Sequence, residues 1–183
     1  MSGIGSSGYV AAGSRVGIRP FAFDDGDEFT ALAAESIAHH RPWLFPPLTA
    51  ETYADYAARV IEEPNKAGFL VCERASGRIA GFVTVNDMVA GAFQSGAIAY
   101  GAFAHAVGRG LMGEGLGLVM RQAFGPLGLH RLEANIQPRN AASIALVRRA
   151  GFRLEGFSPD MLFIDGAWRD HERWAITADM ATR

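Results

Sequence analysis

A glycine-rich segment in the second half of the chain has residue types suited to binding an anion. It reads Gly108-Arg109-Gly110-Leu111-Met112-Gly113 and lies between a strand-like run and a helix-like run. A loop that opens a helix leaves backbone N–H groups without intrahelical acceptors at the positive end of the helix dipole. Glycines also let a phosphate group approach the backbone closely. The segment therefore predicts a phosphate site, and the alternative is a loop whose glycines serve turn geometry alone.

Two common nucleotide motifs do not explain this segment. No Gly-Lys-Ser or Gly-Lys-Thr follows it, as a P-loop requires. Its spacing matches the dinucleotide fingerprint Gly-x-Gly-x-x-Gly, but that motif needs an acidic residue at the end of a second strand about twenty residues later. The strand there offers only Glu133, in its middle. We therefore interpret the fingerprint as a chance match.

Other side chains able to bind ligands or move protons are spread along the chain. Asn140-Ala141-Ala142-Ser143 opens a predicted helix, in which Asn140 is a good N-cap. Cys72 lies in an apolar run and is predicted to be a buried structural thiol rather than a nucleophile. No metal site is expected, because the histidines have no ligand spacing. These histidines are His39, His40, His105, His130 and His171.

The elements that must position these residues follow from hydrophobic periodicity and turn signals. We expect a first helix from Asp25 to Ala38, with Asp25 and Glu28 as a capping box, and a second helix capped by Thr49. Two further helices are predicted over 111–124 and 140–150, the last ending at Gly151. Strands are predicted over 15–19, 68–73, 78–86, 96–103, 131–136, 161–164 and 168–175. Strands separated by helices in the second half indicate an α/β class with a mixed sheet covered by helices.

Composition limits the function classes. The 183 residues suffice for one domain, and the formal net charge of −2 makes nucleic acid and anionic membranes unexpected partners. No run is long enough for a membrane helix, and no signal peptide is evident. A single cysteine fits a reducing compartment, so we expect a cytoplasmic protein. Residues 1–13 read as a flexible leader and 14–183 as one domain.

Four phrases occur in a fixed order in the second half of the chain. They are His130-Arg131-Leu132-Glu133-Ala134-Asn135-Ile136, Pro138-Arg139-Asn140-Ala141-Ala142-Ser143, Ala150-Gly151-Phe152-Arg153-Leu154-Glu155-Gly156 and Ile164-Asp165-Gly166-Ala167-Trp168-Arg169-Asp170-His171. Together with the glycine-rich loop they resemble the GNAT superfamily of acetyl-CoA-dependent N-acetyltransferases, and within it the ribosomal-protein enzymes of the RimJ and RimL type. The resemblance implies a GNAT fold, with a central mixed, mostly antiparallel sheet flanked by helices.

The resemblance also implies an acetyl-CoA site. The family's pyrophosphate loop, Gln/Arg-x-x-Gly-x-Gly/Ala, maps onto 107–112, and this chain departs from it at Val107 and Met112. Arg109 would add a charged contact to a CoA phosphate, or else is a solvated loop arginine. The residues implied to bind the cofactor are Gly101, Ala102, Phe103, Val107, Gly108, Arg109, Gly110, Leu111, Met112, Asn140 and Ser143.

Catalytic roles are carried over in the same way. A backbone N–H near Tyr100 to Ala102 would stabilise the oxyanion that forms from the thioester, while the Tyr100 side chain is either part of the site or a core aromatic residue. Ser143 is the candidate general acid for the departing thiolate, or else only a first-turn residue. Glu133 and Glu35 are candidates for a general base acting through water, or else solvated or ion-paired acids.

The acceptor is less well defined. The phrase Arg41-Pro42-Trp43-Leu44 is common in this branch, so Trp43 and Phe45, together with Glu35, would line the acceptor site, or the two aromatic residues would pack the first helices together. We expect acetyl transfer to a primary amine by direct attack, first to a protein N-terminal α-amino group. The alternatives are a small-molecule acceptor (an aminoglycoside, polyamine or amino acid) and a CoA-binding sensor without turnover. A homodimer is an open expectation.

Overall fold

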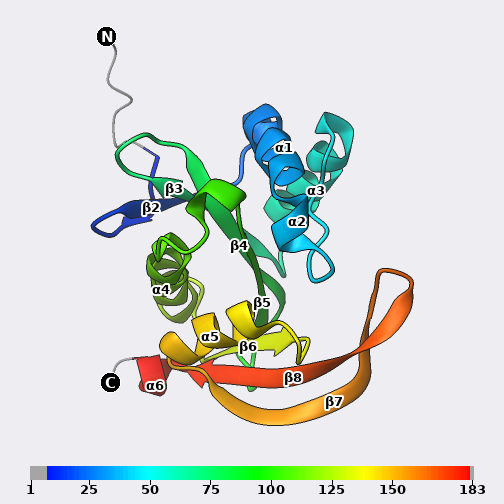
Figure 1. Ribbon diagram of the computed structural model, residues 1–183. Coiled ribbons are helices and arrows are strands. Elements are labelled where there is room, and N and C mark those ends of the chain that lie inside the picture. Colours follow the sequence, from blue (N-terminus) through cyan, green and yellow to red (C-terminus); the bar gives the residue numbers. More distant parts are fainter. Residues whose placement is uncertain (1–7, 182–183) are drawn as a thin grey trace.

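The strand-forming runs of the chain assemble into one eight-stranded sheet of order β1-β2-β3-β4-β5-β6-β8-β7. A computed structural model of the chain describes residues 8–181 (Figure 1). Every neighbouring pair of strands is antiparallel except β5 and β6, which are parallel. The predicted mixed, mostly antiparallel sheet is confirmed. The strands are β1 Ala11–Ala12, β2 Val16–Pro20, β3 Ala67–Glu73, β4 Ile79–Val89, β5 Ser95–Ala102, β6 Arg131–Ile136, β7 Arg153–Ile164 and β8 Ala167–Thr177.

Helices cover both faces of the sheet because strand residues alternate between two hydrophobic clusters. Val71 and Val83 face a cluster that includes α4, whereas Leu70 and Phe82 face a cluster that includes α1 and α3. Figure 1 shows α1 to α3 on one side of the sheet and α4 on the other. The helices are α1 Gly26–Glu35, α2 Ile37–His40, α3 Ala50–Glu62, α4 Leu111–Phe124, α5 Ala141–Arg149 and α6 Ala178–Ala181, with 3-10 turns at Phe23–Asp25 and Ala104–Ala106. Among the described residues, no helix combines the length and apolar character needed to cross a membrane.

The N-terminal region differs from expectation in two places. Residues 1–7 of the expected leader lie outside the described residues, but Ala11–Ala12 forms strand β1, paired with Gly17 and Ile18. The expected first helix is divided at Ser36 into α1 and α2. The buried Ser36 hydroxyl donates to Leu32 O at 2.6 Å and accepts from the Ala104 N–H at 2.8 Å. These bonds hold the start of α2 against the loop that follows β5.

The predicted helix caps are confirmed at two sites and wrong at one. Thr49 caps α3 and Asn140 caps α5, each through a side-chain oxygen that accepts a backbone N–H three residues later. Asp25 makes no cap hydrogen bond to α1, because its carboxylate binds the Arg19 guanidinium. Glu28 instead accepts the Ile79 N–H at 2.8 Å. The expected capping box is therefore replaced by tertiary contacts.

The feature that creates room in the sheet is the separation of β5 from β6. These strands pair only at Ser95, Gly96 and Ala97, although β5 continues to Ala102 and β6 to Ile136. Beyond that point β6 pairs with β8 alone and β5 with β4 alone. The two parallel strands therefore diverge toward their C-terminal ends, which is where open α/β sheets accept ligands.

Candidate functional site

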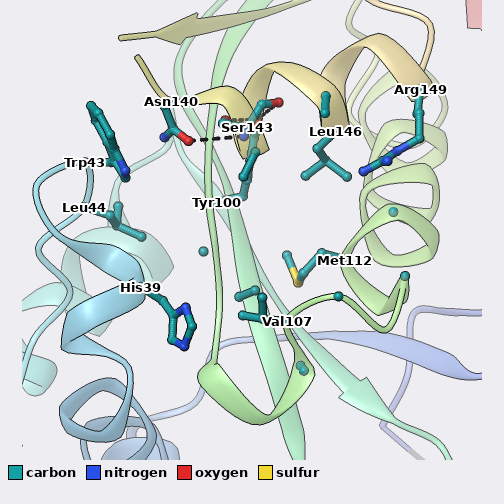
Figure 2. Close-up of a pocket in the computed structure, with 18 of the residues that line it drawn as sticks. His39, Trp43, Leu44, Tyr100, Val107, Met112, Asn140, Ser143, Leu146 and Arg149 are labelled. Carbon is teal, nitrogen blue, oxygen red and sulfur yellow. Dashed lines mark hydrogen bonds between the residues drawn. The ribbon is translucent and has the colours of Figure 1, made fainter. Parts of the chain in front are cut away.

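A cavity of about 880 Å³ lies where β5 and β6 diverge. Four segments supply its lining: the end of α2 with the following loop, the end of β5, the turn that leads into α4, and α5. Figure 2 shows His39, Trp43 and Leu44 on one side, Leu146 and Arg149 on the other, and Tyr100, Ser143 and Met112 between them. The volume is in the range of small-molecule and cofactor sites.

Strand β5 presents backbone N–H groups to this cavity. Gly81 pairs with Ala102 in the register of β4 and β5. Directly beyond this pair, the Phe103 N–H donates to Ala80 O at 2.9 Å, which continues the ladder. Because bonding direction alternates along an antiparallel strand, the N–H groups of Tyr100 and Ala102 point away from β4. They point toward the side that β6 has left. This is the region in which the sequence places an oxyanion donor.

The turn before α4 has the backbone of an anion site. Gly108 and Gly110 have φ values of +75° and +73°, which L side chains rarely adopt. Gly110 is the N-cap of α4 and offers no side-chain hydrogen bond, and the first backbone bond of the helix runs from the Glu114 N–H to Gly110 O. The N–H groups at the start of α4 therefore lack both intrahelical acceptors and a side-chain cap. Gly108, Gly110 and Gly113 all line the cavity.

The two departures from the family loop have separate structural settings. Val107 is exposed and lines the cavity, where its backbone can serve as well as that of a polar residue. Met112 is buried and fits because Gly81 lies opposite, since a Cβ at Gly81 would collide with Met112 Sδ. The long residue at a usually small position is thus compensated by a glycine on β4.

A hydrogen-bonded polar chain crosses the cavity from β5 to α5. Tyr100 Oη and Ser143 Oγ are 2.5 Å apart, and the Asn140 side chain accepts the Ser143 N–H at 3.2 Å. Burial raises the pKa of Tyr100 to about 12, partly offset by the bond to Ser143, so this phenol is neutral near pH 7. Three predicted site residues are thus brought together, and the two bonded hydroxyls of Tyr100 and Ser143 can donate or relay a proton.

Several other predicted cofactor residues lie elsewhere. Phe103 and Leu111 are buried in the hydrophobic core and do not line the cavity, whereas Gly101 and Ala102 do. The Arg109 guanidinium is directed away from the cavity to Glu73, with N–O distances of 2.7 and 3.1 Å. Its side chain is therefore held by the end of β3.

Three other predicted site residues, Glu133, Glu35 and Phe45, do not line the cavity either. Glu133 binds Arg131 at 2.8 Å on β6, and Glu35 is exposed at the end of α1, 3.8 Å from Arg78. The Phe45 ring packs under the Arg41 guanidinium, 4.7 Å from its centroid, and borders a separate small cavity of about 30 Å³. Of the residues expected at the acceptor side, only Trp43 lines the main cavity.

Sequence reasoning missed two cavity histidines. His40 is buried, and its Nε2 lies 2.8 Å from Ala102 O, so Nε2 carries the proton that this carbonyl accepts. Burial lowers the pKa of His40, the bond to Ala102 opposes that shift, and the adjacent His39 adds to it. His39 is exposed and lines the same cavity. Adjacent histidines on a four-residue helix carry no periodic signal that would have indicated this arrangement.

Sequence reasoning also missed the far side of the cavity. Leu146 and Arg149 line it and follow Ser143 at intervals of three residues on α5. Side chains at this spacing share one helix face. With Ser143 as a site residue, this three-residue spacing in the sequence also indicates Leu146 and Arg149.

Comparisons with known proteins point to one family. The family model described as Acetyltransferase (GNAT) domain matches residues 15–153. A Bacillus subtilis (strain 168) protein described as "Probable N-acetyltransferase YjcK" is 30% identical over 174 residues, and the match covers 90% of this chain and 94% of that protein. The ribosomal protein uS5 alanine N-acetyltransferase of Escherichia coli (strain K12) is 33% identical over 155 residues, and the match covers 79% of this chain and 80% of that protein.

Solved structures show the same fold. The structure of Mycobacterium smegmatis RimJ in complex with CoA-disulfide has a TM-score of 0.84 and 27% identity, and the match covers 92% of this chain and 84% of that chain. Ribosomal-protein-S5-alanine acetyltransferase from Vibrio fischeri has a TM-score of 0.82 and 23% identity, with 92% and 96% coverage. The second likeness concerns the fold alone.

Proposed function

The chain belongs to the GNAT acetyltransferase family, and on that premise we propose that it transfers an acetyl group from acetyl-CoA to the α-amino group of a protein N-terminus. The observation that carries the proposal is one cavity that joins three features: an uncapped helix start, the free side of β5 and the Tyr100–Ser143 pair. A relative at 33% identity acetylates an alanine of ribosomal protein uS5, as its name states.

Donor binding is assigned to main-chain groups. The turn with Gly108 and Gly110 and the start of α4 fit a diphosphate, because their N–H groups lack intrahelical acceptors at a positive helix end. The free side of β5 fits the extended pantetheine arm. The likeness to a RimJ structure that contains a CoA-disulfide supports this assignment. Binding through main-chain N–H groups also agrees with a net charge of −2, since no basic surface is needed.

The residues around β5 then divide the chemistry between them. An N–H of Tyr100 or Ala102 stabilises the oxygen that becomes negative when the amine attacks the thioester carbonyl. Ser143 donates a proton to the sulfur as the carbon–sulfur bond breaks and regains one from solvent water, and Tyr100 holds the Ser143 hydroxyl in place. An α-amino group has a reference pKa near 8, so a fraction of it is neutral without a strong base. His39, which lines the cavity, is placed to receive the ammonium proton through water.

Charge in the cavity favours an acceptor with a single amine over a polycation. Among the described lining residues, Glu114 is the only carboxylate, and it is bonded to Arg15 at 3.1 Å. A polyamine or aminoglycoside would bring several positive charges into a cavity without free carboxylates, and buried charges need partners. A peptide N-terminus with a small first residue brings one amine and neutral amides.

The test is an acceptor panel with thiol release as the readout. We expect turnover with peptides that carry a free N-terminal alanine or serine and much less with spermidine or kanamycin. N-terminally formylated copies of the same peptides are the matched control and should be inactive. Preferred turnover of a polyamine or aminoglycoside would replace the acceptor assignment, and CoA binding without any turnover would indicate a sensor.

A further inference from the structure

We propose that Arg15 is a positioning residue that sets the backbone of the phosphate-binding turn from outside the cavity. All three nitrogens of its guanidinium donate hydrogen bonds to residues at or near the start of α4. Nη1 donates to Arg109 O at 2.8 Å, Nη2 donates to Gly110 O at 3.2 Å, and Nε donates to a Glu114 carboxylate oxygen at 3.1 Å. Arg15 itself does not line the cavity. The inference rests on the donor half of the proposed function and not on the identity of the acceptor.

The two carbonyls that Arg15 binds determine where two N–H groups point. In a planar trans peptide unit the C=O and the N–H point in opposite directions. Fixing Arg109 O toward Arg15 therefore turns the Gly110 N–H the other way, and fixing Gly110 O does the same for the Leu111 N–H. Because Gly110 lines the cavity and Arg15 does not, these N–H groups are turned toward the cavity side of the loop. Glycine at 110 permits the φ of +73° that this orientation requires.

Glu114 makes the Arg15 contact rigid. Besides Arg15 Nε, its carboxylate accepts the backbone N–H groups of Arg15 at 2.8 Å and Val16 at 3.3 Å. Burial alone would raise the pKa of Glu114, but these hydrogen bonds outweigh that effect and hold the pKa below its usual range. The carboxylate is therefore ionised and fastens the start of β2 to the first turn of α4. Arg15 is thus held at both its backbone and its guanidinium.

Arg15, and not Arg109, is the arginine whose side chain contacts the carbonyl groups of the turn. The Arg109 guanidinium is bound to Glu73, so its side chain points away from the loop's inner face. The Arg15 guanidinium instead lies beside Gly110, 3.3 Å from where a Cβ would stand. The Glu114 carboxylate balances the Arg15 charge, so Arg15 acts on a bound diphosphate through the peptide units that it orients.

The test compares two ligands that differ in the diphosphate. CoA binding is measured by calorimetry, and pantetheine binding by ligand-observed NMR titration. For Arg15→Gln we expect CoA affinity to fall about tenfold or more, as for loss of charge-assisted hydrogen bonds, while pantetheine affinity stays within about twofold. Arg15→Lys keeps the charge but not the planar group that donates to three acceptors. Its CoA affinity should lie between those of wild type and Arg15→Gln.

Arg74→Gln is the matched control, because Arg74 Nη1 donates to Gly13 O at 2.9 Å on the same segment. It should keep wild-type CoA affinity. The proposal is overturned if Arg15→Gln binds CoA like wild type, or if it weakens CoA and pantetheine equally. Failure of the wild-type protein to bind CoA is a different result, which contradicts the donor site itself.

Discussion

Tyr100 on β5 and Ser143 in the first turn of α5 share a hydrogen bond of 2.5 Å across the cavity, although 43 residues separate them in the chain. The bond exists because β5 leaves β6 after Ala97, which lets α5 approach the free side of β5. The same divergence leaves the N–H groups of Tyr100 and Ala102, which point away from β4, without a partner strand. One topological feature therefore supplies both the proposed oxyanion donor and the proposed acid.

Ser143→Ala should lower kcat by about a hundredfold, in the range for loss of a positioned general acid. The KM for acetyl-CoA should change little, because donor binding is assigned to main-chain groups. Steady-state kinetics measure both constants. Ser76→Ala, in the turn between β3 and β4, is the control and should behave as wild type. Unchanged turnover of Ser143→Ala would remove the acid assignment.

Trp43→Ala should raise the KM for the peptide acceptor about fivefold or more, since an aromatic contact with the acceptor is lost. CoA affinity should not change, because donor binding is assigned to the turn before α4 and to β5, and Trp43 lies in the loop after α2. Phe45→Ala is the matched control, as Phe45 packs on Arg41 and does not line the main cavity. Equal effects of the two substitutions would place the acceptor elsewhere.

Acid should destabilise the protein partly through His40. Burial lowers the folded-state pKa of His40, so the neutral imidazole is favoured in the folded state and the unfolded chain binds more protons. The stability contributed by this group is present above the unfolded pKa of about 6.5 and is lost as pH falls below it. Thermal unfolding midpoints measured between pH 7.5 and 5.5 give the slope of stability against pH.

His40→Gln should flatten that slope even if its midpoint at pH 7.5 is lower. Burial also lowers the pKa of His105, so part of the wild-type slope should remain in the variant. An identical slope in wild type and His40→Gln would show that His40 does not titrate as its surroundings indicate.

Local signals in the sequence predicted most of the elements, but of β7, Arg153–Ile164, only residues 161–164 were expected. Thr49 and Asn140 are capping residues whose partners are three residues away, so their roles depend on neighbours in the chain. Asp25 has the same local pattern, yet its carboxylate binds Arg19 and makes no cap hydrogen bond to α1. Strand β1 was missed because Ala11 and Ala12 have no periodic pattern and pair only through backbone.

The candidate site was predictable where it consists of backbone and not where it depends on side-chain partners. The glycines of the turn follow from residue type, because φ values near +75° select glycine. The direction of Arg109 depends on Glu73, and the position of Arg15 depends on Glu114, both far away in the chain. Without the fold, nothing distinguishes these arginines from the fourteen others among the sixteen that the sequence contains.

The central claim is acetylation of an α-amino group, and mass spectrometry of one peptide tests it most directly. The peptide begins with a free alanine and contains one internal lysine, and it is incubated with acetyl-CoA, the protein and equimolar spermidine. We predict a single added acetyl group, located at the N-terminal nitrogen by fragmentation, with the lysine and spermidine unmodified. Acetylated spermidine with an unmodified peptide, or an acetyl group on the lysine alone, would contradict the account.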